Sequence, residues 1–377
     1  METTNTFLAS LKITILFLLI SLFGCQQKEE TIRVAFNLPL TGELSTYGVS
    51  IRDGARLAFD DLSSKYESDR ININYRVDFQ DNGGIARNAG TIFQRQRAQG
   101  YDFYVSGVKP QTMAIIDNVS SVGKPHFVWI FDAFVTSNYP NTYRTWVNYK
   151  YESIYYLKYI DVVRPEKVAI IYVNLPHTVE QFNDLILPEL NERNIENVLI
   201  EQYPIDKNEF RDIAIKLRQF NPDLIIINGF KSNLLRIIPT FREYNLIKAG
   251  NTICTFDFLD AAEDLSNELK EGIRFVAPRF ETREPREKTS DFRNRFNNRF
   301  NRSPRYTDAY AYDLMMVIDN LSVNSKLMNG TTDDFIQNLS FEGVTGYIEF
   351  DETGDIILEL DVAYFENGIL KYELLEQ

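Results

Sequence analysis

The stretch Ile32-Arg-Val-Ala-Phe-Asn-Leu-Pro-Leu-Thr-Gly-Glu-Leu-Ser-Thr-Tyr-Gly48 begins with a short β-rich run that ends at Leu38 and continues into a glycine-bounded loop. The next residues, Ser50–Leu62, place their apolar side chains on one stripe of a helix, which is typical of a helix that covers a core. A strand that leads through a loop into a helix is the unit from which parallel sheets are built. This first unit therefore predicts an α/β fold.

The same unit recurs along the chain. The other strands that we expect are Ile73-Phe79, Phe103-Val105, His126-Ile130, Lys167-Tyr172, Asn197-Tyr203, Leu224-Asn228, Thr252-Phe256 and Ile273-Ala277. Helices are expected at Phe210–Phe220 and Thr289–Asn301, where apolar side chains recur at helical spacing. Two blocks of these units predict two doubly wound parallel-sheet lobes, the first ending near Val147 and the second beginning near Asn148.

The composition excludes several functions. The chain has 377 residues, enough for two domains with ordinary cores. Its net charge of −13 argues against a nucleic-acid partner, because phosphate binding requires a field of the opposite sign. Two histidines and two cysteines exclude most metal and thiol chemistry, and we expect no cofactor. One basic stretch, Arg279 to Arg305, is interpreted as a solvated helix face, with a partner-docking patch as the alternative.

Motifs of catalysis do not occur in the sequence. We find no Gly-x-Ser-x-Gly elbow, Walker phosphate loop, His-Glu-x-x-His pair or Cys-x-x-Cys. Nucleophilic catalysis needs a base beside a nucleophile, and the two histidines are His126, inside an expected strand, and His177, in an expected loop. We therefore expect that the protein is not an enzyme.

The N-terminal residues resemble a bacterial export signal. The apolar run Ile13–Phe23 is too short for a membrane-spanning helix, which takes about 20 residues, and Lys12 precedes it as in a cleaved signal peptide. The run ends in Leu22-Phe23-Gly24-Cys25, which resembles a lipobox and implies cleavage of residues 1–24 and lipidation of Cys25. Residues 25–30 then form a tether at a bacterial membrane, on the periplasmic side or at the cell surface. Plain signal cleavage and a buried N-terminal helix are the alternatives.

Three segments together resemble a known family. They are Ile32–Gly48 with the following Ser50–Ala58, then Pro304-Arg-Tyr-Thr-Asp-Ala-Tyr-Ala-Tyr-Asp313, and Gly343-Val-Thr-Gly-Tyr-Ile-Glu-Phe-Asp-Glu-Thr-Gly-Asp355. In this order and spacing they are similar to the type I periplasmic solute-binding proteins of branched-chain amino acid ABC transporters. The resemblance implies two lobes, joined by three crossing strands, that hold a ligand in the cleft between them. It places the first lobe at 31–147 plus 277–354 and the second at 148–276 plus 355–377.

On the first lobe, the resemblance points to loops at the carboxyl ends of strands, where ligands bind in open α/β sheets. The tyrosine that matches Tyr47 contacts ligand in the family, although a packing role is the alternative. Pro110 suits a first helical turn, so free N–H groups of Gln111 and Thr112 would face the cleft and attract an anion.

Two charged residues on the first lobe depart from the family's pattern. The family has a small hydroxyl residue where Lys109 stands, and a threonine or serine near Asp132. Lys109 could bind an anionic ligand, pair with an acid in the cleft, or point to solvent. Because each charge would offset the cost of desolvating the other, Lys109 and Asp132 are a coherent joint substitution. They put a plain branched-chain amino acid ligand in doubt.

On the second lobe, the resemblance implies three further ligand contacts. His177 is the nearest counterpart of a family aromatic, with a surface or structural histidine as the alternative. Phe230 falls at another family aromatic. Asp257 occupies the acidic position that receives the ligand's ammonium group, with a solvated or capping aspartate as the alternative. A charge-assisted bond at that position contributes about 1.5–3 kcal/mol.

The sequence thus predicts an extracytoplasmic, lipid-anchored binding protein. We expect it to be a monomer that closes on a small polar ligand, an amino acid or a related compound, and presents it to an ABC permease. A ligand-sensing receptor of the same fold is the main alternative, and a surface lipoprotein with a degenerate cleft is another. The sequence does not identify the ligand.

Overall fold

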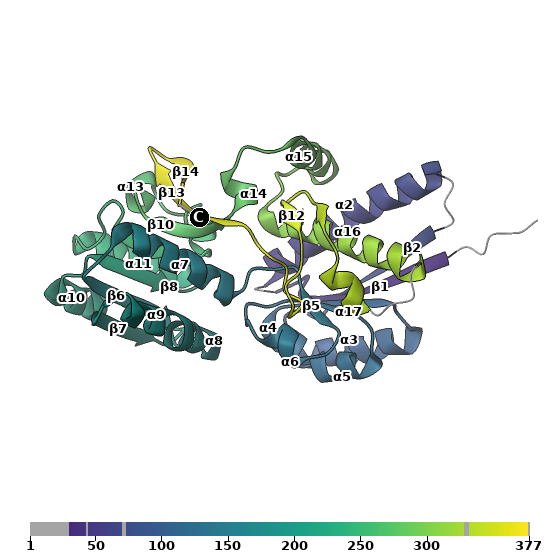
Figure 1. Ribbon diagram of the computed structural model, residues 1–377, viewed down its shortest axis with the longest axis horizontal. Helices are drawn as coiled ribbons and strands as arrows, with labels where there is room; N and C mark the ends of the chain where they lie inside the picture. Colours follow the sequence, from purple (N-terminus) through teal and green to yellow (C-terminus); the bar gives the residue numbers. More distant parts are fainter. Residues whose placement is uncertain (1–29, 43, 70–72, 328–331, 376–377) are drawn as a thin grey trace, which may run out of the picture.

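The computed structural model of the chain describes residues 30–42, 44–69, 73–327 and 332–375. The signal peptide and the lipidated Cys25 that we predict lie outside these residues. Among the residues described, none of the helices combines the length and the apolar character needed to cross a membrane. The predicted α/β architecture of two lobes with parallel sheets is confirmed, and Figure 1 shows the two sheets side by side along the long axis.

The first sheet defines the first lobe. Among the described residues it has five strands in the order β2-β1-β3-β4-β5, and every neighbouring pair is parallel. The strands are β1 (Glu30–Leu38), β2 (Ile73–Asp81), β3 (Phe103–Gly107), β4 (His126–Trp129) and β5 (Thr142–Arg144). The first four were predicted, and β5 was not.

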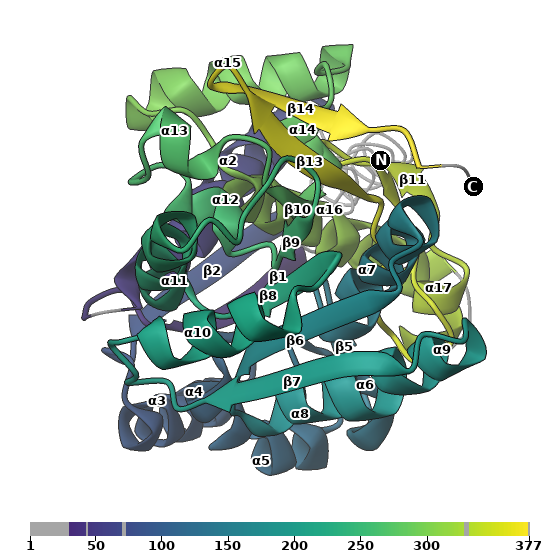
Figure 2. The same cartoon turned by 90° about the vertical axis from the view of Figure 1, so that its left-hand side faces the viewer.

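The second sheet defines the second lobe. Its described strands follow the order β14-β13-β10-β9-β8-β6-β7, with β7 at one edge and β14 at the other in Figure 2. They are β6 (Lys167–Val173), β7 (Asn197–Tyr203), β8 (Leu224–Asn228), β9 (Thr252–Cys254), β10 (Arg274–Pro278), β13 (Leu360–Glu366) and β14 (Ile369–Glu373). The last two were not predicted, and they join antiparallel to an otherwise parallel sheet.

Helices cover both sheets, and a small hairpin of β11 (Phe341–Glu342) and β12 (Tyr347–Ile348) lies beside the first. The helices of the first lobe are α2 (Ser45–Asp69), α3 (Ala86–Gln99), α4 (Lys109–Met113), α5 (Ile116–Val122), α6 (Val135–Asn138), α15 (Glu287–Phe300), α16 (Tyr306–Leu327) and α17 (Thr332–Gln337). Those of the second are α7 (Tyr149–Val163), α8 (Pro176–Glu180), the π-helix η1 (Gln181–Ile186), α9 (Leu187–Glu192), α10 (Arg211–Phe220), α11 (Lys231–Glu243), α12 (Phe258–Ala261) and α13 (Asn267–Lys270), while α14 (Arg279–Thr282) follows β10. The predicted helical stripes are largely buried, as in α10, where Ile213, Ala214 and Leu217 face the core.

The chain passes between the two lobes after β5, after β10 and before β13, and Figure 1 shows these connections between the sheets. Two details differ from the boundaries that we expected. Ala277 and Pro278 belong to β10 and so to the second sheet. Asp355 pairs with Arg144 beside the first sheet, where the two side chains form a buried salt bridge of 2.7 Å.

The segments that resemble the binding-protein family pack against one another. A side chain at Gly54 would place its Cβ 2.0 Å from the backbone oxygen of Asp308, so α2 and α16 approach more closely than any larger residue would permit. Arg302 donates to Asp308 at 2.7 Å. Farther along α16, the Asp313 carboxylate accepts the backbone N–H groups of Val344 and Thr345 at 2.8 and 2.9 Å.

The basic stretch lies largely against acids of the first lobe. Arg295 pairs with Asp61 and Arg299 pairs with Asp60, so two arginines of α15 contact carboxylates of α2. Partially exposed pairs of this kind contribute little to stability. Their charges are nevertheless matched within the chain, which does not favour the docking-patch interpretation.

Candidate functional site

Five aromatic side chains connect the two lobes, and we call them the aromatic cluster: Trp129, Phe131, Trp146, Phe256 and Tyr306. Trp129 ends β4 of the first sheet and Phe256 follows β9 of the second. The ring centroids of Phe131 and Phe256 are 5.3 Å apart, and those of Trp146 and Tyr306 are 5.5 Å apart. The residues after the carboxyl ends of strands from both sheets therefore meet at this place, which we call the lobe junction.

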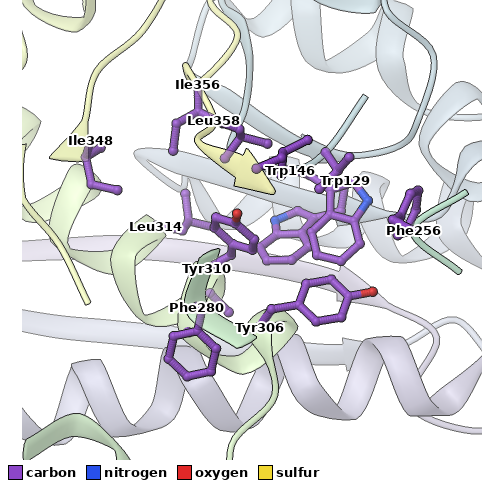
Figure 3. Packing of buried hydrophobic residues seen from close by; sticks show 14 of the residues in the cluster. Trp129, Trp146, Phe256, Phe280, Tyr306, Tyr310, Leu314, Ile348, Ile356 and Leu358 are labelled. Carbon is purple, nitrogen blue, oxygen red and sulfur yellow. The ribbon is translucent and has the colours of Figure 1, made fainter. Parts of the chain in front are cut away.

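Two polar atoms of the aromatic cluster lack a partner. The indole Nε1 of Trp129 and the hydroxyl of Tyr306 are buried without a hydrogen bond. Figure 3 shows that both atoms point toward the side on which Phe256 lies. Since buried polar groups in proteins are nearly always hydrogen-bonded, these two atoms mark the lobe junction as a candidate binding site.

Tyr47 and Asp257 come together across the lobe junction. Tyr47 lies in the first turn of α2, where we expected a loop, and Asp257 immediately precedes α12 of the second lobe. The negative charge of Asp257 is the largest cause that raises the pKa of Tyr47, and a hydrogen bond between the two side chains acts in the same direction. The structure therefore places these two predicted ligand contacts in one site.

Asp257 is a buried carboxyl group, 7% exposed. Burial raises the pKa of Asp257 well above its usual range, the charges of Asp260 and Glu152 raise it further, and the hydrogen bond with Tyr47 opposes the rise. Behind it, Glu152 of α7 accepts the backbone N–H of Phe256 at 2.9 Å and so holds the segment that presents Asp257.

Lys109 and Asp132 form an ion pair within the first lobe. The other oxygen of Asp132, Oδ2, is buried without a partner. Of the three roles that we considered for Lys109, the structure therefore displays the pairing with an acid. The second lobe contributes His177, whose ring meets that of Phe131 edge to face at 5.8 Å.

Burial and the positive charge of Lys109 lower the pKa of His177, whereas Asp132 and Glu180 oppose this change. The imidazole is therefore neutral near pH 7. Its Nδ1 is buried without a partner. His177 thus reaches the lobe junction as a neutral group.

Gln111 and Thr112 turn inward, and one expectation about them is wrong. The backbone N–H of Thr112 is not free, because it donates to the carbonyl oxygen of Val108 at 2.9 Å. The Thr112 hydroxyl bonds to Ser106 at 2.9 Å inside the core. Gln111 donates to the carbonyl oxygen of Gly84, while its Oε1 is buried without a partner. A helix as short as α4 therefore offers no row of free amides to an anion.

Phe230 differs from the other predicted contacts because its side chain is on the surface. It is the N-cap residue of α11 and is 37% exposed. It lies on the second lobe at the end of the β8 connection, but no ring contact joins it to the aromatic cluster in the described part of the chain.

Sequence reasoning missed the aromatic cluster. Trp129, Phe131 and Phe256 fall in or directly after apolar strands, where an aromatic residue reads as core packing. Tyr306 lies in the second quoted segment, beside Arg305, but its place in that motif does not reveal the direction of its ring. The one available signal was the position of both tryptophans of the chain at or near strand ends.

Other features of the structure lie away from the lobe junction. Two hollows of about 260 and 320 Å³ occur elsewhere, one beside Tyr312 and Asp319 of α16 and the other beside Arg279 of α14 and the following Arg283. In the part of the chain that the structure describes, no group of three or more histidine, cysteine, aspartate or glutamate side chains is placed to hold a metal ion.

Comparisons with known proteins identify the family and the fold of the chain. The model of the periplasmic binding protein family matches residues 31–355. A search of curated proteins finds no match. Among solved structures, the branched-chain amino acid transporter substrate-binding protein LivJ from Streptococcus pneumoniae, in complex with isoleucine, is 19% identical with a TM-score of 0.73, covering 91% of this chain and 99% of that chain.

Two further solved structures are similar over the same length. An amino acid ABC transporter substrate-binding protein from Pseudomonas fluorescens has a TM-score of 0.77 and 17% identity, covering 91% of this chain and 95% of that one. A solute-binding protein of an ABC transporter from R. palustris, in complex with 4-hydroxybenzoate, has a TM-score of 0.75 and 15% identity, covering 92% and 96%. At these identities the likeness shows the fold.

Proposed function

The chain belongs to the periplasmic binding protein family, and from this premise we propose that it is an extracytoplasmic solute-binding protein that delivers a small ligand to an ABC transporter. The ligand is captured at the lobe junction by closure of the two lobes. Cys25 carries the lipid that holds the protein at a bacterial membrane, and the folded part acts as a monomer. The structurally similar proteins include one in complex with isoleucine and one in complex with 4-hydroxybenzoate, which supports a ligand of that size.

One observation carries this proposal: buried polar atoms without a partner gather where the lobes meet. Trp129 Nε1, the Tyr306 hydroxyl and Asp132 Oδ2 come from the first lobe, and His177 Nδ1 comes from the second. An unsatisfied buried polar group costs about 1–3 kcal/mol. A bound ligand supplies the missing partners to groups from both lobes at once, which is what a closing binding protein requires.

Closure needs a difference in affinity between the open and the closed state. A shift from 1:99 to 99:1 in favour of the closed state takes about 5.5 kcal/mol. Contacts that exist only when the lobes are together supply such a difference. Arg305 of the first lobe pairs with Asp260 of the second, and Phe131 meets Phe256, so the lobes already possess direct contacts that a ligand reinforces.

A thermal-shift screen tests the binding role. The mature protein, residues 25–377 without the lipid, is heated in the presence of amino acids, amines, amides, peptides or organic acids. At least one of these compounds is expected to raise the midpoint temperature of unfolding. For a compound that bears an ammonium group, the increase should become smaller in Asp257→Asn and persist in Asp184→Asn, a control on an exposed residue of the same lobe. The binding role is refuted if no compound stabilises the protein and no small molecule remains with it after purification.

The lipid anchor is tested separately. The chain has two cysteines, and the second, Cys254, is buried in the second lobe. Cells that express the full chain should incorporate labelled palmitate into the protein, and Cys25→Ser should abolish the label while Cys254→Ser retains it. Equal labelling of the wild type and Cys25→Ser would contradict the anchor.

A further inference from the structure

The cations around the lobe junction are already neutralised by acids of the chain. Lys109 pairs with Asp132 on the same lobe. Arg305 pairs with Asp260 across the junction and lies 3.5 Å from Glu263. The site therefore offers no unpaired lysine or arginine among these groups to receive the carboxylate of a ligand.

Asp257 is in the opposite situation. It is buried, and no lysine or arginine pairs with it in the part of the chain that the structure describes. The acids Asp260 and Glu152 are its charged neighbours, and the hydroxyl-bearing Tyr47 also lies beside it. A buried carboxylate without a counter-ion is costly, and a cation that binds beside it removes that cost.

From this charge balance, and provided that the proposed binding role holds, we infer that the ligand is an organic amine without a carboxylate. Its ammonium group binds Asp257, and its apolar body lies against the aromatic cluster. Aromatic faces also attract cations, so Trp146, Phe256 and Tyr306 favour the same ligand class. Under this inference Lys109 does not bind an anionic group of the ligand, which was one of the three roles that we considered for it.

Binding of an amine has a proton signature at this site. Burial and neighbouring acids favour the protonated form of Asp257 when no ligand is bound, because its pKa is raised. An ammonium ligand favours the carboxylate, so Asp257 loses its proton to solvent as the complex forms. The affinity for an amine must therefore increase as the pH rises toward the pKa of Asp257 in the free protein. A carboxylate ligand held by Lys109 would release no proton.

Matched compounds test the inference directly. Isothermal titration calorimetry compares 2-phenylethylamine, phenylalanine and 3-phenylpropionate, and in parallel isopentylamine, leucine and 4-methylpentanoate. Within each set the apolar body is similar, and only the charged groups change. We expect the amine to bind roughly 10- to 100-fold more tightly than the other two, with release of a proton that is detected by comparing phosphate and Tris buffers.

Variants of the two acids give opposite results. Asp257→Asn should weaken amine binding roughly 10- to 100-fold and remove the proton release, whereas Asp184→Asn should change neither. Because the free protein favours the neutral carboxyl form of Asp257, an amide of similar shape should not lower the thermal midpoint of unfolding, which separates lost binding from lost folding. Asp132→Asn releases Lys109 from its pair and should create binding of the carboxylate-bearing compounds.

Each outcome is decisive for one proposal or for both. Tighter binding of phenylalanine or of an organic acid than of the amine overturns the ligand class and leaves the solute-binding role in place. Loss of that binding in Lys109→Met would assign the carboxylate to Lys109. If neither these compounds nor any member of the thermal-shift screen binds, both the ligand class and the binding role are overturned.

Discussion

Replacing Glu152 by alanine is expected to destabilise the second lobe strongly. The Glu152 carboxylate is completely buried and accepts three close hydrogen bonds. They come from the hydroxyl of Thr255 at 2.6 Å, the backbone N–H of Phe256 at 2.9 Å and the side-chain amide of Gln181 at 2.9 Å. In Glu152→Ala all three donors stay buried and lose their acceptor.

The magnitude follows from these three donors. A buried donor without an acceptor costs about 1–3 kcal/mol, and partial entry of water into the vacated space limits the sum, so we expect a loss of about 3–5 kcal/mol in the free energy of unfolding. For a lobe of this size the loss lowers the thermal midpoint on the order of 10 °C. Glu152→Gln retains a carbonyl oxygen for two of the donors, and its loss should be near 1 kcal/mol.

Urea unfolding followed by circular dichroism measures this loss, with calorimetry to separate the transitions of the two lobes. Glu209→Ala provides the control, because Glu209 is an exposed glutamate of the same lobe. The reasoning is refuted if Glu152→Ala unfolds within 1 kcal/mol of the wild type, or if Glu152→Gln and Glu152→Ala are equally destabilised.

Three further predictions concern stability. Burial lowers the pKa of His126 to about 3, so the unfolded chain binds a proton at this histidine at higher pH than the folded chain does. The free energy of unfolding should therefore decrease from pH 6.5 toward pH 3. The prediction is contradicted if the thermal midpoint of His126→Gln depends on pH as strongly as that of the wild type. Asp355→Ala leaves the buried Arg144 without its partner and should lower the free energy of unfolding, measured in urea, by about 3–5 kcal/mol. If Asp355→Ala is as stable as the wild type, this ion pair does not have the role that we assign to it. Gly54→Ala should lower the free energy of unfolding by about 1–3 kcal/mol, because its Cβ would lie 2.0 Å from a backbone oxygen of α16. Gly90→Ala has free space around the new Cβ and should raise the thermal midpoint of unfolding. An increase of the thermal midpoint in both variants would refute the close approach of α2 and α16.

Much of the fold was predictable from the sequence because the inner strands of both sheets, such as β3, β4, β6 and β8, are buried on both faces and read as apolar runs. All nine strands that we expected are present. β5 escaped because Thr142–Arg144 is too short to show a pattern, and it ends in a buried arginine. β13 escaped because Asp361 interrupts its apolar run; that carboxylate is buried and is neutralised by Arg283 at 2.6 Å.

The candidate site was predictable only where a residue type and a strand end coincide. Asp257 fulfils that condition, because it comes shortly after β9. Tyr47 lies in the first turn of α2 and was identified through the family resemblance, and the structure brings the two residues together. The aromatic cluster was not predictable, because its members become a site only when two segments far apart in the sequence meet. For Lys109, the sequence left three roles open, and the choice among them depends on a distance to Asp132 that no sequence pattern supplies.

The central claim, that a small ligand binds at the lobe junction, has a direct spectroscopic test. The chain contains two tryptophans, and both Trp129 and Trp146 belong to the aromatic cluster, so the tryptophan emission of the protein reports on this place. A compound that stabilises the protein should produce a saturable change in emission, with the dissociation constant found by calorimetry, and Asp257→Asn should weaken both signals together. Binding in calorimetry without any change in tryptophan emission would place the ligand elsewhere and contradict the claim.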